Sequence, residues 1–452
     1  MESIILTSSL FMLALLGTLY VVGKNWNASF LSFLFADRSL TIASTGLAIS
    51  AHWFWAIAIF VGPAVAYNWG VIGLLWFVIP NALSLLVVGY LTKGIRDKYP
   101  DGYSLTNYTK ENFSSRVSAL YQTEFSLVAF AALLLAFTAI SKLWAFTGLA
   151  STIEPIYASL AVGLVTLAFT LRGGIRTSIF TGAIQTVLWI ALLAVATAAI
   201  LFGGENYLSL GKNSLDTVFN EKFLTTFAVA WFITIMVGAT GHGMMWQKAF
   251  SMPKENIMPT FALGAVCFTV VTFGICQLGM YAFANNLTVA AADTSQMIAL
   301  SALLGTGAVV VFATILVGQT STVIDSALNY ISSLISAEWL KKSEVTTSRI
   351  AMTVFMLLAW AVSWLKLEIW TIVMLMGCLR VSMFVPIALH TTGTKLRESA
   401  IFYCSLIAVV GSFYLSYTAR MEKLPIYDMY SALFALLVPA VGLYLTREKE
   451  LV

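Results

Sequence analysis

The sequence predicts an all-α integral membrane protein with about 13 transmembrane helices. Hydrophobic residues make up 59% of the 452 residues, whereas charged residues make up only 10%. Together with a mean hydropathy of +0.88, this balance is not that of a water-soluble globular protein. Apolar runs long enough to cross a bilayer as a helix also recur along the whole chain.

The expected spans follow one another, mostly with short connections. The first run, Ile4 to Val22, has no basic segment before it and no small-residue cleavage site after it, so we expect a retained helix rather than a cleaved signal peptide. By length and hydropathy, the spans are expected at residues 3–23, 42–68, 71–92, 118–141, 150–171, 177–203, 223–247, 257–285, 303–336, 348–365, 369–390, 399–418 and 426–446.

Lysine and arginine are distributed unevenly between the two sides of the membrane. If the N-terminus is outside, the inner loops, with Lys248 and Lys254 among them, hold roughly three times as many of these residues as the outer loops. The sequence therefore predicts a protein integral to the cell membrane, with its N-terminus outside and its C-terminus in the cytoplasm. The net charge of +4 follows from this bias and requires no nucleic-acid partner.

The stretch Thr41–Gly70 is long enough to cross the bilayer, yet its middle is not what lipid favours. Small, polar and indole side chains occur there: Gly46, Ser50, His52, Trp53 and Trp55. A backbone in the membrane can leave the helical hydrogen-bonding pattern only where it is buried in protein or lines a watery cavity. We therefore expect this span to be interrupted and to form half of a transport site.

A second span of this kind lies at Phe223–Trp246, where three glycines surround His242. Paired interrupted helices in corresponding positions of two halves are typical of transporters built from inverted repeats, with the substrate site between them. We expect one transmembrane domain with an extra first helix and inner loop (1–40), a first repeat (41–203, spans 2–6), a second repeat (223–390, spans 7–11) and two last helices (391–452). The alternative is that both histidines are packed side chains bonded to backbone carbonyls.

Other classes of function lack their sequence signals. No phosphate-binding loop of the GxxxxGK[ST] type occurs, so we do not expect ATP hydrolysis to drive transport. The three histidines show no metal-ligand spacing and no nucleophile motif, so the sequence does not predict an enzyme. The four cysteines lie in apolar segments without a CxxC pair and are expected to be buried thiols: Cys267, Cys276, Cys378 and Cys404.

Four stretches carry a resemblance to a known family: ADRSL (36–40), RGGIRTSIFTGAIQ (172–185), MWQKAFSMPKEN (245–256) and TSTVIDSALNYISSLIS (320–336). With them, the region from Phe35 to Arg397 resembles the sodium:solute symporters, whose leucine-transporter-like core has five-plus-five inverted repeats. WFWA in the second span and WQKA after the seventh look most like the urea-permease branch. The two glycines of GGIRT are also expected to allow a sharp turn at the inner surface.

The resemblance implies a sodium site between the second and ninth spans. Members of the family bind sodium through carbonyls of the first core helix, here those of Gly46 and Ile49, and hydroxyls of the eighth core helix, here those of Ser321 and Thr322. Hydroxyls three and four residues apart share one helix face, which agrees with this interpretation. The alternative is that they bond back to their own helix.

The chain departs from the family at Thr181-Gly182, where many members have Thr-Asp with the aspartate near the sodium pathway or a second sodium site. Gly182 offers no carboxylate. The departure therefore implies coupling to a single sodium ion, unless Asp325 supplies the missing charge from the ninth span. The alternative is that coupling has been lost and the solute equilibrates.

Asp325 and Arg380 are charged residues expected inside spans. Each costs about 2.5–3.5 kcal/mol at a helix centre on insertion scales, which makes both candidates for function. Either the two residues form an ion pair, or Arg380 faces an anionic solute or Asp325 a cation. Glu124, near the inner end of its span, is expected to reach the inner water.

The sequence thus predicts a secondary transporter that moves a small polar organic solute by alternating access, with sodium as the coupling ion. We expect the pocket between the second and seventh spans, where His52 and His242 are polar contacts and Trp53 and Trp55 are walls. Urea, an amino acid and a small carboxylate all fit such a pocket. Solute and lipid bilayer are the expected partners, and the protein is expected to function as a monomer.

A transporter-like sensor that binds the solute and signals is the alternative from another class. The sequence ends a few residues after the last expected span, so we expect no output domain in the same chain.

Overall fold

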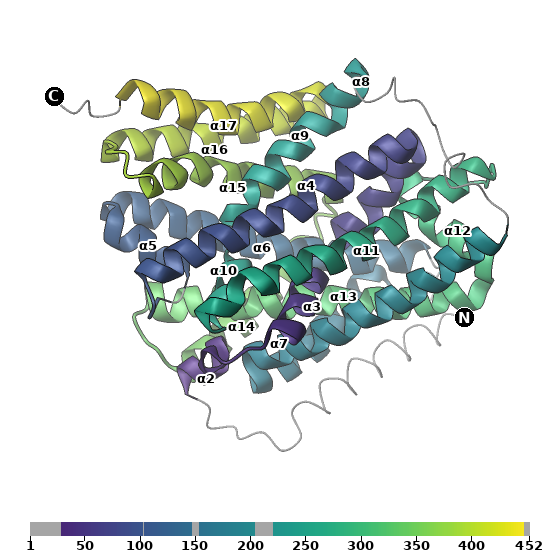
Figure 1. The fold of residues 1–452 in the computed structure, drawn as a ribbon, viewed down its shortest axis with the longest axis horizontal. Coiled ribbons are helices and arrows are strands. Elements are labelled where there is room, and N and C mark those ends of the chain that lie inside the picture. Colours follow the sequence, from purple (N-terminus) through teal and green to yellow (C-terminus); the bar gives the residue numbers. More distant parts are fainter. Residues whose placement is uncertain (1–28, 103, 147–152, 204–219, 447–452) are drawn as a thin grey trace.

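The computed structural model of the protein describes residues 29–102, 104–146, 153–203 and 220–446, so the span expected at 3–23 lies outside the described residues. Within these ranges the chain is helical and contains no strand. Ten helices of the described part are long and apolar enough to cross a membrane. Most of the long helices run side by side along the long direction of the molecule (Figure 1).

The first half begins with α2 (Phe30–Phe35) and the short 3₁₀ turn Ala36–Arg38, followed by α3 (Ile42–Trp53). A π-helical turn, Ile57–Val61, leads into α4 (Gly62–Lys98). Within this 42-residue helical stretch Gly70 has a positive φ of 62°, which divides it into two segments. The chain therefore enters the span expected at 71–92 directly through this bend.

After the short α5 (Leu105–Asn112), α6 (Ser115–Phe146) and α7 (Pro155–Phe202) complete the first half. α7 has 48 residues. At about 1.5 Å per residue it is more than twice as long as the ~30 Å hydrocarbon core is thick. Gly174, with a φ of 56°, bends α7 within the GGIRT stretch, which confirms the expected turn between two spans.

The second half begins with a helix that is repeatedly irregular. The short α8 (Glu221–Phe223) and α9 (Val229–Phe232) alternate with π-helical turns, and a 3₁₀ turn at Gly238–Gly241 precedes α10 (Gly243–Phe250). The remaining helices of this half are α11 (Ile257–Ala284), α12 (Ser295–Leu304), α13 (Thr306–Ser333), α14 (Val345–Ser363) and α15 (Ile369–Thr391).

The short α3 lies in the interior of the molecule, where it packs against α7, α11 and α13, and α11 runs along α4 (Figure 1). α15 belongs to the interior as well, because 78% of its apolar 18-residue segment is buried. In α14, α16 (Glu398–Met421) and α17 (Ile426–Thr446), only 28% of the corresponding segment is buried, so these three helices lie at the periphery. All four cysteines are free thiols, with only Cys404 partly exposed.

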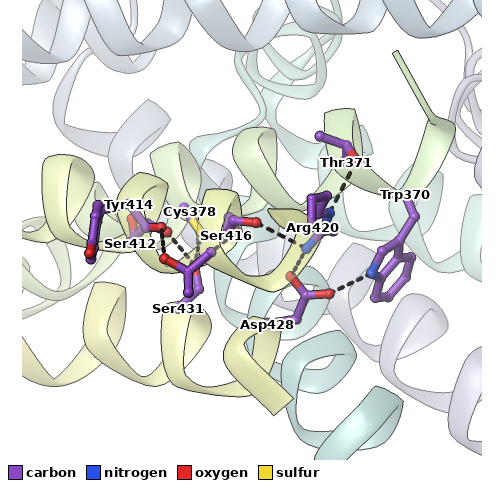
Figure 2. A network of polar contacts seen from close by, with 10 residues as sticks. Trp370, Thr371, Cys378, Ser412, Tyr414, Ser416, Arg420, Asp428 and Ser431 are labelled. Atoms are coloured by element: carbon purple, nitrogen blue, oxygen red, sulfur yellow. Dashed lines mark hydrogen bonds and ion pairs between the residues drawn. The ribbon is translucent and has the colours of Figure 1, made fainter. Parts of the chain in front are cut away.

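A polar network fixes the two last helices to the start of α15 (Figure 2). The Asp428 carboxylate, only 2% exposed, forms an ion pair with Arg420 and accepts a hydrogen bond from Nε1 of Trp370 at 2.8 Å. Arg420 also donates from Nε to the Thr371 hydroxyl at 3.1 Å. Because a buried carboxylate is stable only when it is paired and hydrogen-bonded, this network holds α16 and α17 against the core.

Candidate functional site

The span expected to be interrupted near His52 is interrupted in the structure. α3 ends at Trp53, and Phe54 leaves the helical conformation with φ −85° and ψ 68°. The residues of the break are buried, with Phe54 1% and Trp55 4% exposed. The Ala51 carbonyl, just before the break, accepts a hydrogen bond from the Gln319 side chain of α13. The loosened backbone is therefore covered by protein, as a break inside a membrane requires.

The second break lies at His242, whose φ of −92° and ψ of 83° separate the 3₁₀ turn Gly238–Gly241 from α10. The glycines around His242 allow close packing. A Cβ atom on Gly243 would overlap the Tyr330 ring of α13, and one on Gly241 would lie 2.8 Å from Cα of Arg380 on α15. Larger residues at these positions would push α13 and α15 away from the break.

The two breaks meet at their histidines. Nε2 of His52 lies 2.8 Å from Nε2 of His242, so the two rings share a hydrogen bond. The Trp53 and Trp55 rings stand edge-on to the His242 ring, with centroids 5.2 and 5.7 Å away. All four side chains are at most 4% exposed. The structure thus brings together the four residues expected to form the pocket, and the histidines bond to each other rather than to backbone carbonyls.

The hydrogen bond between the two histidines leaves their Nδ1 atoms able to bond to a solute. If both rings are neutral, one Nε2 donates and the other accepts, so that one Nδ1 remains an acceptor and the other a donor. Neither Nδ1 has a partner among the described residues, and the same is true of Nε1 of Trp53. A polar solute at this point would therefore meet two N–H donors and one acceptor between aromatic rings.

Replacing His242 by alanine is expected to raise the dissociation constant of the solute by roughly 2- to 10-fold, because the loss of one hydrogen bond costs about 0.5–1.5 kcal/mol. Sodium binding should change little. Calorimetric titration of purified protein would measure both affinities. The matched control is His390→Ala, because His390 contacts the Tyr108 hydroxyl at 2.5 Å rather than either break. An unchanged solute affinity in the His242 variant would remove this residue from the site.

The residues that the resemblance implies for sodium lie on two helices: Gly46 and Ile49 on α3, and Ser321 and Thr322 on α13. Gly46 and Ile49 belong to the regular part of α3, before its break. Ser321 donates to the carbonyl of Gly318 at 2.6 Å, as the back-bonding alternative expects. Thr322 instead donates to Oε1 of Gln185 on α7 at 2.7 Å.

Gly182 lies where α3, α7 and α13 come together. A Cβ atom on this residue would lie 3.1 Å from Cγ2 of Thr322 and 3.3 Å from Cα of Ala48. The missing side chain therefore allows the Thr322 turn of α13 to lie close to α3, next to Ile49. A side chain at this position would require Thr322 or Ala48 to shift by a few tenths of an ångström.

Asp325 and Arg380 are both fully buried, but they form no ion pair with each other. Asp325 accepts hydrogen bonds from the hydroxyls of Ser178 and Thr181 on α7. Arg380 donates from Nη2 to the Thr234 carbonyl at 3.1 Å, and its Nε and Nη1 have no partner among the described residues. The mutual ion pair, one of the two arrangements that the sequence left open, is therefore not formed.

Two charged residues are more buried than the sequence predicted. Lys248, assigned to an inner loop, belongs to α10, is 2% exposed and donates to the Ser326 hydroxyl at 2.9 Å. Glu124, expected to reach the inner water, is also 2% exposed and accepts a hydrogen bond from Ser382 at 3.3 Å. The sequence analysis assigned Lys248 to a loop because it did not expect a new helix, α10, to start directly after the break at His242. The apolar residues on both sides of Lys248 in the WQKAF stretch were the available signal that this lysine could be buried.

No family model matches the chain. The spermidine transporter DUR31 of Candida albicans is 27% identical over 220 residues, which cover 46% of this chain and 39% of that protein. The urea-proton symporter DUR3 of Oryza sativa subsp. japonica is 22% identical over 300 residues, covering 58% and 40%. The matched parts of the chain thus correspond to about two fifths of the length of these relatives.

Solved structures are similar over almost the whole chain. A substrate-bound, outward-open Na⁺-coupled sialic acid symporter matches with a TM-score of 0.67 and 15% identity, covering 98% of both chains. MhsT in complex with L-phenylalanine matches with a TM-score of 0.55 and 12% identity, covering 90% of this chain and 98% of that one. These neighbours are transporters and not enzymes. At such identities the similarity shows the fold, which is the all-helical membrane fold of leucine-transporter-like symporters with five-plus-five inverted repeats.

Proposed function

We propose that this chain is a sodium-coupled secondary transporter that moves a small polar organic solute by alternating access. The observation that carries the proposal is the 2.8 Å contact between His52 and His242, which joins the two interrupted helices at their breaks. Transporters of this architecture bind solute where discontinuous helices of the two repeats face each other. We propose that the buried His52, Trp53, Trp55 and His242 line the solute site.

The solute is proposed to be compact and rich in hydrogen-bond acceptors. Three groups at the breaks, the two Nδ1 atoms and Nε1 of Trp53, have no protein partner among the described residues. Arg380 packs against Gly238 and Gly241, immediately before His242, with two nitrogens of its guanidinium group still unbonded. Urea, an amino acid or a small carboxylate offers carbonyl or carboxylate oxygens to the donors among these groups, which are Nε1 of Trp53, one Nδ1 and the two Arg380 nitrogens.

Sodium is proposed to bind between α3 and α13, at the carbonyls of Gly46 and Ile49 and the hydroxyls of Ser321 and Thr322. Both hydroxyls donate their hydrogen to other acceptors, so their lone pairs are available to a cation. Sodium is a hard cation that prefers oxygen ligands, and carbonyls of a discontinuous helix are its usual partners in this architecture.

The proposed arrangement in the membrane follows the distribution of basic residues. We place the N-terminus outside and the C-terminus in the cytoplasm of a cell-membrane protein. The proposed repeats are 41–203 and 223–390, with an additional segment, 1–40, before them and two helices in 391–452 after them.

The proposal predicts that solute uptake depends on one sodium ion. Because Gly182 offers no carboxylate for a second site, initial uptake into proteoliposomes should rise with sodium concentration with a Hill coefficient near one. A coefficient near two would contradict the single site. The same assay with a panel of labelled solutes identifies the solute class.

Other outcomes of this assay identify the alternatives. Uptake that follows a pH gradient without sodium would replace sodium by the proton, the ion in the printed name of the rice relative. Equilibration of solute without any ion dependence would identify a facilitator. Binding without counterflow would identify a sensor.

A further inference from the structure

Lys248 is a buried cation that has no role in the proposed solute site or in the proposed sodium site. It lies on α10, six residues after His242, and only 2% of it is exposed. Its ammonium donates to the Ser326 hydroxyl of α13 at 2.9 Å. An isolated ammonium in such a place is very unfavourable, so a negative charge must lie nearby.

Asp325 supplies that negative charge from the residue next to Ser326. It is fully buried, and its carboxylate accepts hydrogen bonds from Ser178, Thr181 and Ser326, the last two at 3.3 and 3.2 Å. Lys248 makes no direct ion pair with Asp325, because the Ser326 hydroxyl accepts from the ammonium and donates to the carboxylate. The hydroxyl thus couples two opposite charges across α10 and α13.

The atoms around the carboxylate are the ligands of a hard cation. Two carboxylate oxygens and the hydroxyl oxygens of Ser178, Thr181 and Ser326 converge from α7 and α13. A hard cation such as sodium takes oxygen ligands, and the carboxylate adds one full negative charge to this set. This oxygen cluster adjoins Gly182, which directly follows Thr181. Its carboxylate comes from the ninth span instead of from position 182.

We propose that the oxygen cluster of Asp325, Ser178, Thr181 and Ser326 is a second cation site, and that Lys248 fills it with a built-in cation. This proposal rests on the proposed transport function, and it explains why transport would be coupled to one sodium ion and not to two. The tethered ammonium balances Asp325 permanently, and its charge repels sodium from the cluster. Removal of the ammonium would expose an unbalanced carboxylate with three hydroxyls, to which sodium would bind.

The test is to replace Lys248 by glutamine and to count bound sodium ions. Equilibrium titration of the purified full-length protein with sodium chloride, against choline chloride as the blank, should show one more sodium ion per chain in Lys248→Gln than in the unchanged protein. The further variant Lys248→Gln with Asp325→Asn should lose this additional ion. The matched control is Lys254→Gln, because Lys254 is 51% exposed and pairs with Asp97, so its removal should leave the number unchanged.

An equal number of sodium ions in folded Lys248→Gln and in the unchanged protein would overturn the proposal. If Lys248→Gln folds poorly, its yield of monodisperse protein should be restored by sodium but not by choline, and the absence of such rescue would equally overturn it. Both measurements, the number of bound sodium ions and the yield of folded protein, are made without any transport assay. They therefore test this proposal even if the unchanged protein binds no sodium and the proposed coupling fails.

Discussion

Replacement of Gly174 by alanine is expected to lower the free energy of unfolding by roughly 3 kcal/mol or more, with loss of most folded protein. Gly174 has φ 56° and ψ −143°, a region open almost only to glycine. A Cβ atom there would also overlap the Phe33 carbonyl oxygen of α2, and backbone cannot move aside as a flexible side chain can. The bend between the two segments of α7 would have to open.

Thermal unfolding in detergent, monitored by intrinsic tryptophan fluorescence, would measure this loss. Gly173→Ala is the matched control, since Gly173 is adjacent, belongs to the same motif and has ordinary helical backbone angles. Alanine there should be neutral or stabilise the helix by up to about 1 kcal/mol. Equal melting temperatures for the two variants would show that the positive φ at Gly174 does not define the bend.

The spans and both breaks could be predicted because their signals are local in the sequence. Length and hydropathy identify a helix that crosses a membrane, and polar or glycine-rich centres identify the two that are interrupted. His52 and His242 were thus expected near one another, and they contact. The bend at Gly174 could also be predicted from the sequence, because two glycines lie between Arg172 and Arg176.

The partners of the buried charges could not be predicted, because they depend on how each helix is rotated about its axis. Neighbouring residues of a helix point about 100° apart, and sequence spacing alone does not say which face meets which helix. Asp325 faces the hydroxyls of α7, whereas Arg380 faces the irregular helix at Thr234 and Gly241. The burial of Lys248 could not be predicted for the same reason, since it depends on how α10 packs against α13.

Replacement of Arg380 by glutamine is expected to reduce kcat/KM for a carboxylate-bearing solute by roughly 10- to 150-fold. Arg380 is fully buried and forms no ion pair among the described residues, and two of its three nitrogens lack partners there. It packs directly on Gly241, one residue before His242. An anionic solute would supply the missing counter-charge, and a hydrogen bond to a charged group is worth about 1.5–3 kcal/mol.

Uptake of a carboxylate and of urea should therefore be compared in the same proteoliposomes. Glutamine keeps a donor but not the charge, so the carboxylate should lose far more than urea, and Arg380→Lys should recover part of the difference. The bond from Arg380 to the Thr234 carbonyl points to the competing role, in which the arginine only stabilises the loosened helix. In that case both solutes would lose equally and the melting temperature would fall. A differential loss at an unchanged melting temperature is the result that assigns Arg380 to the solute.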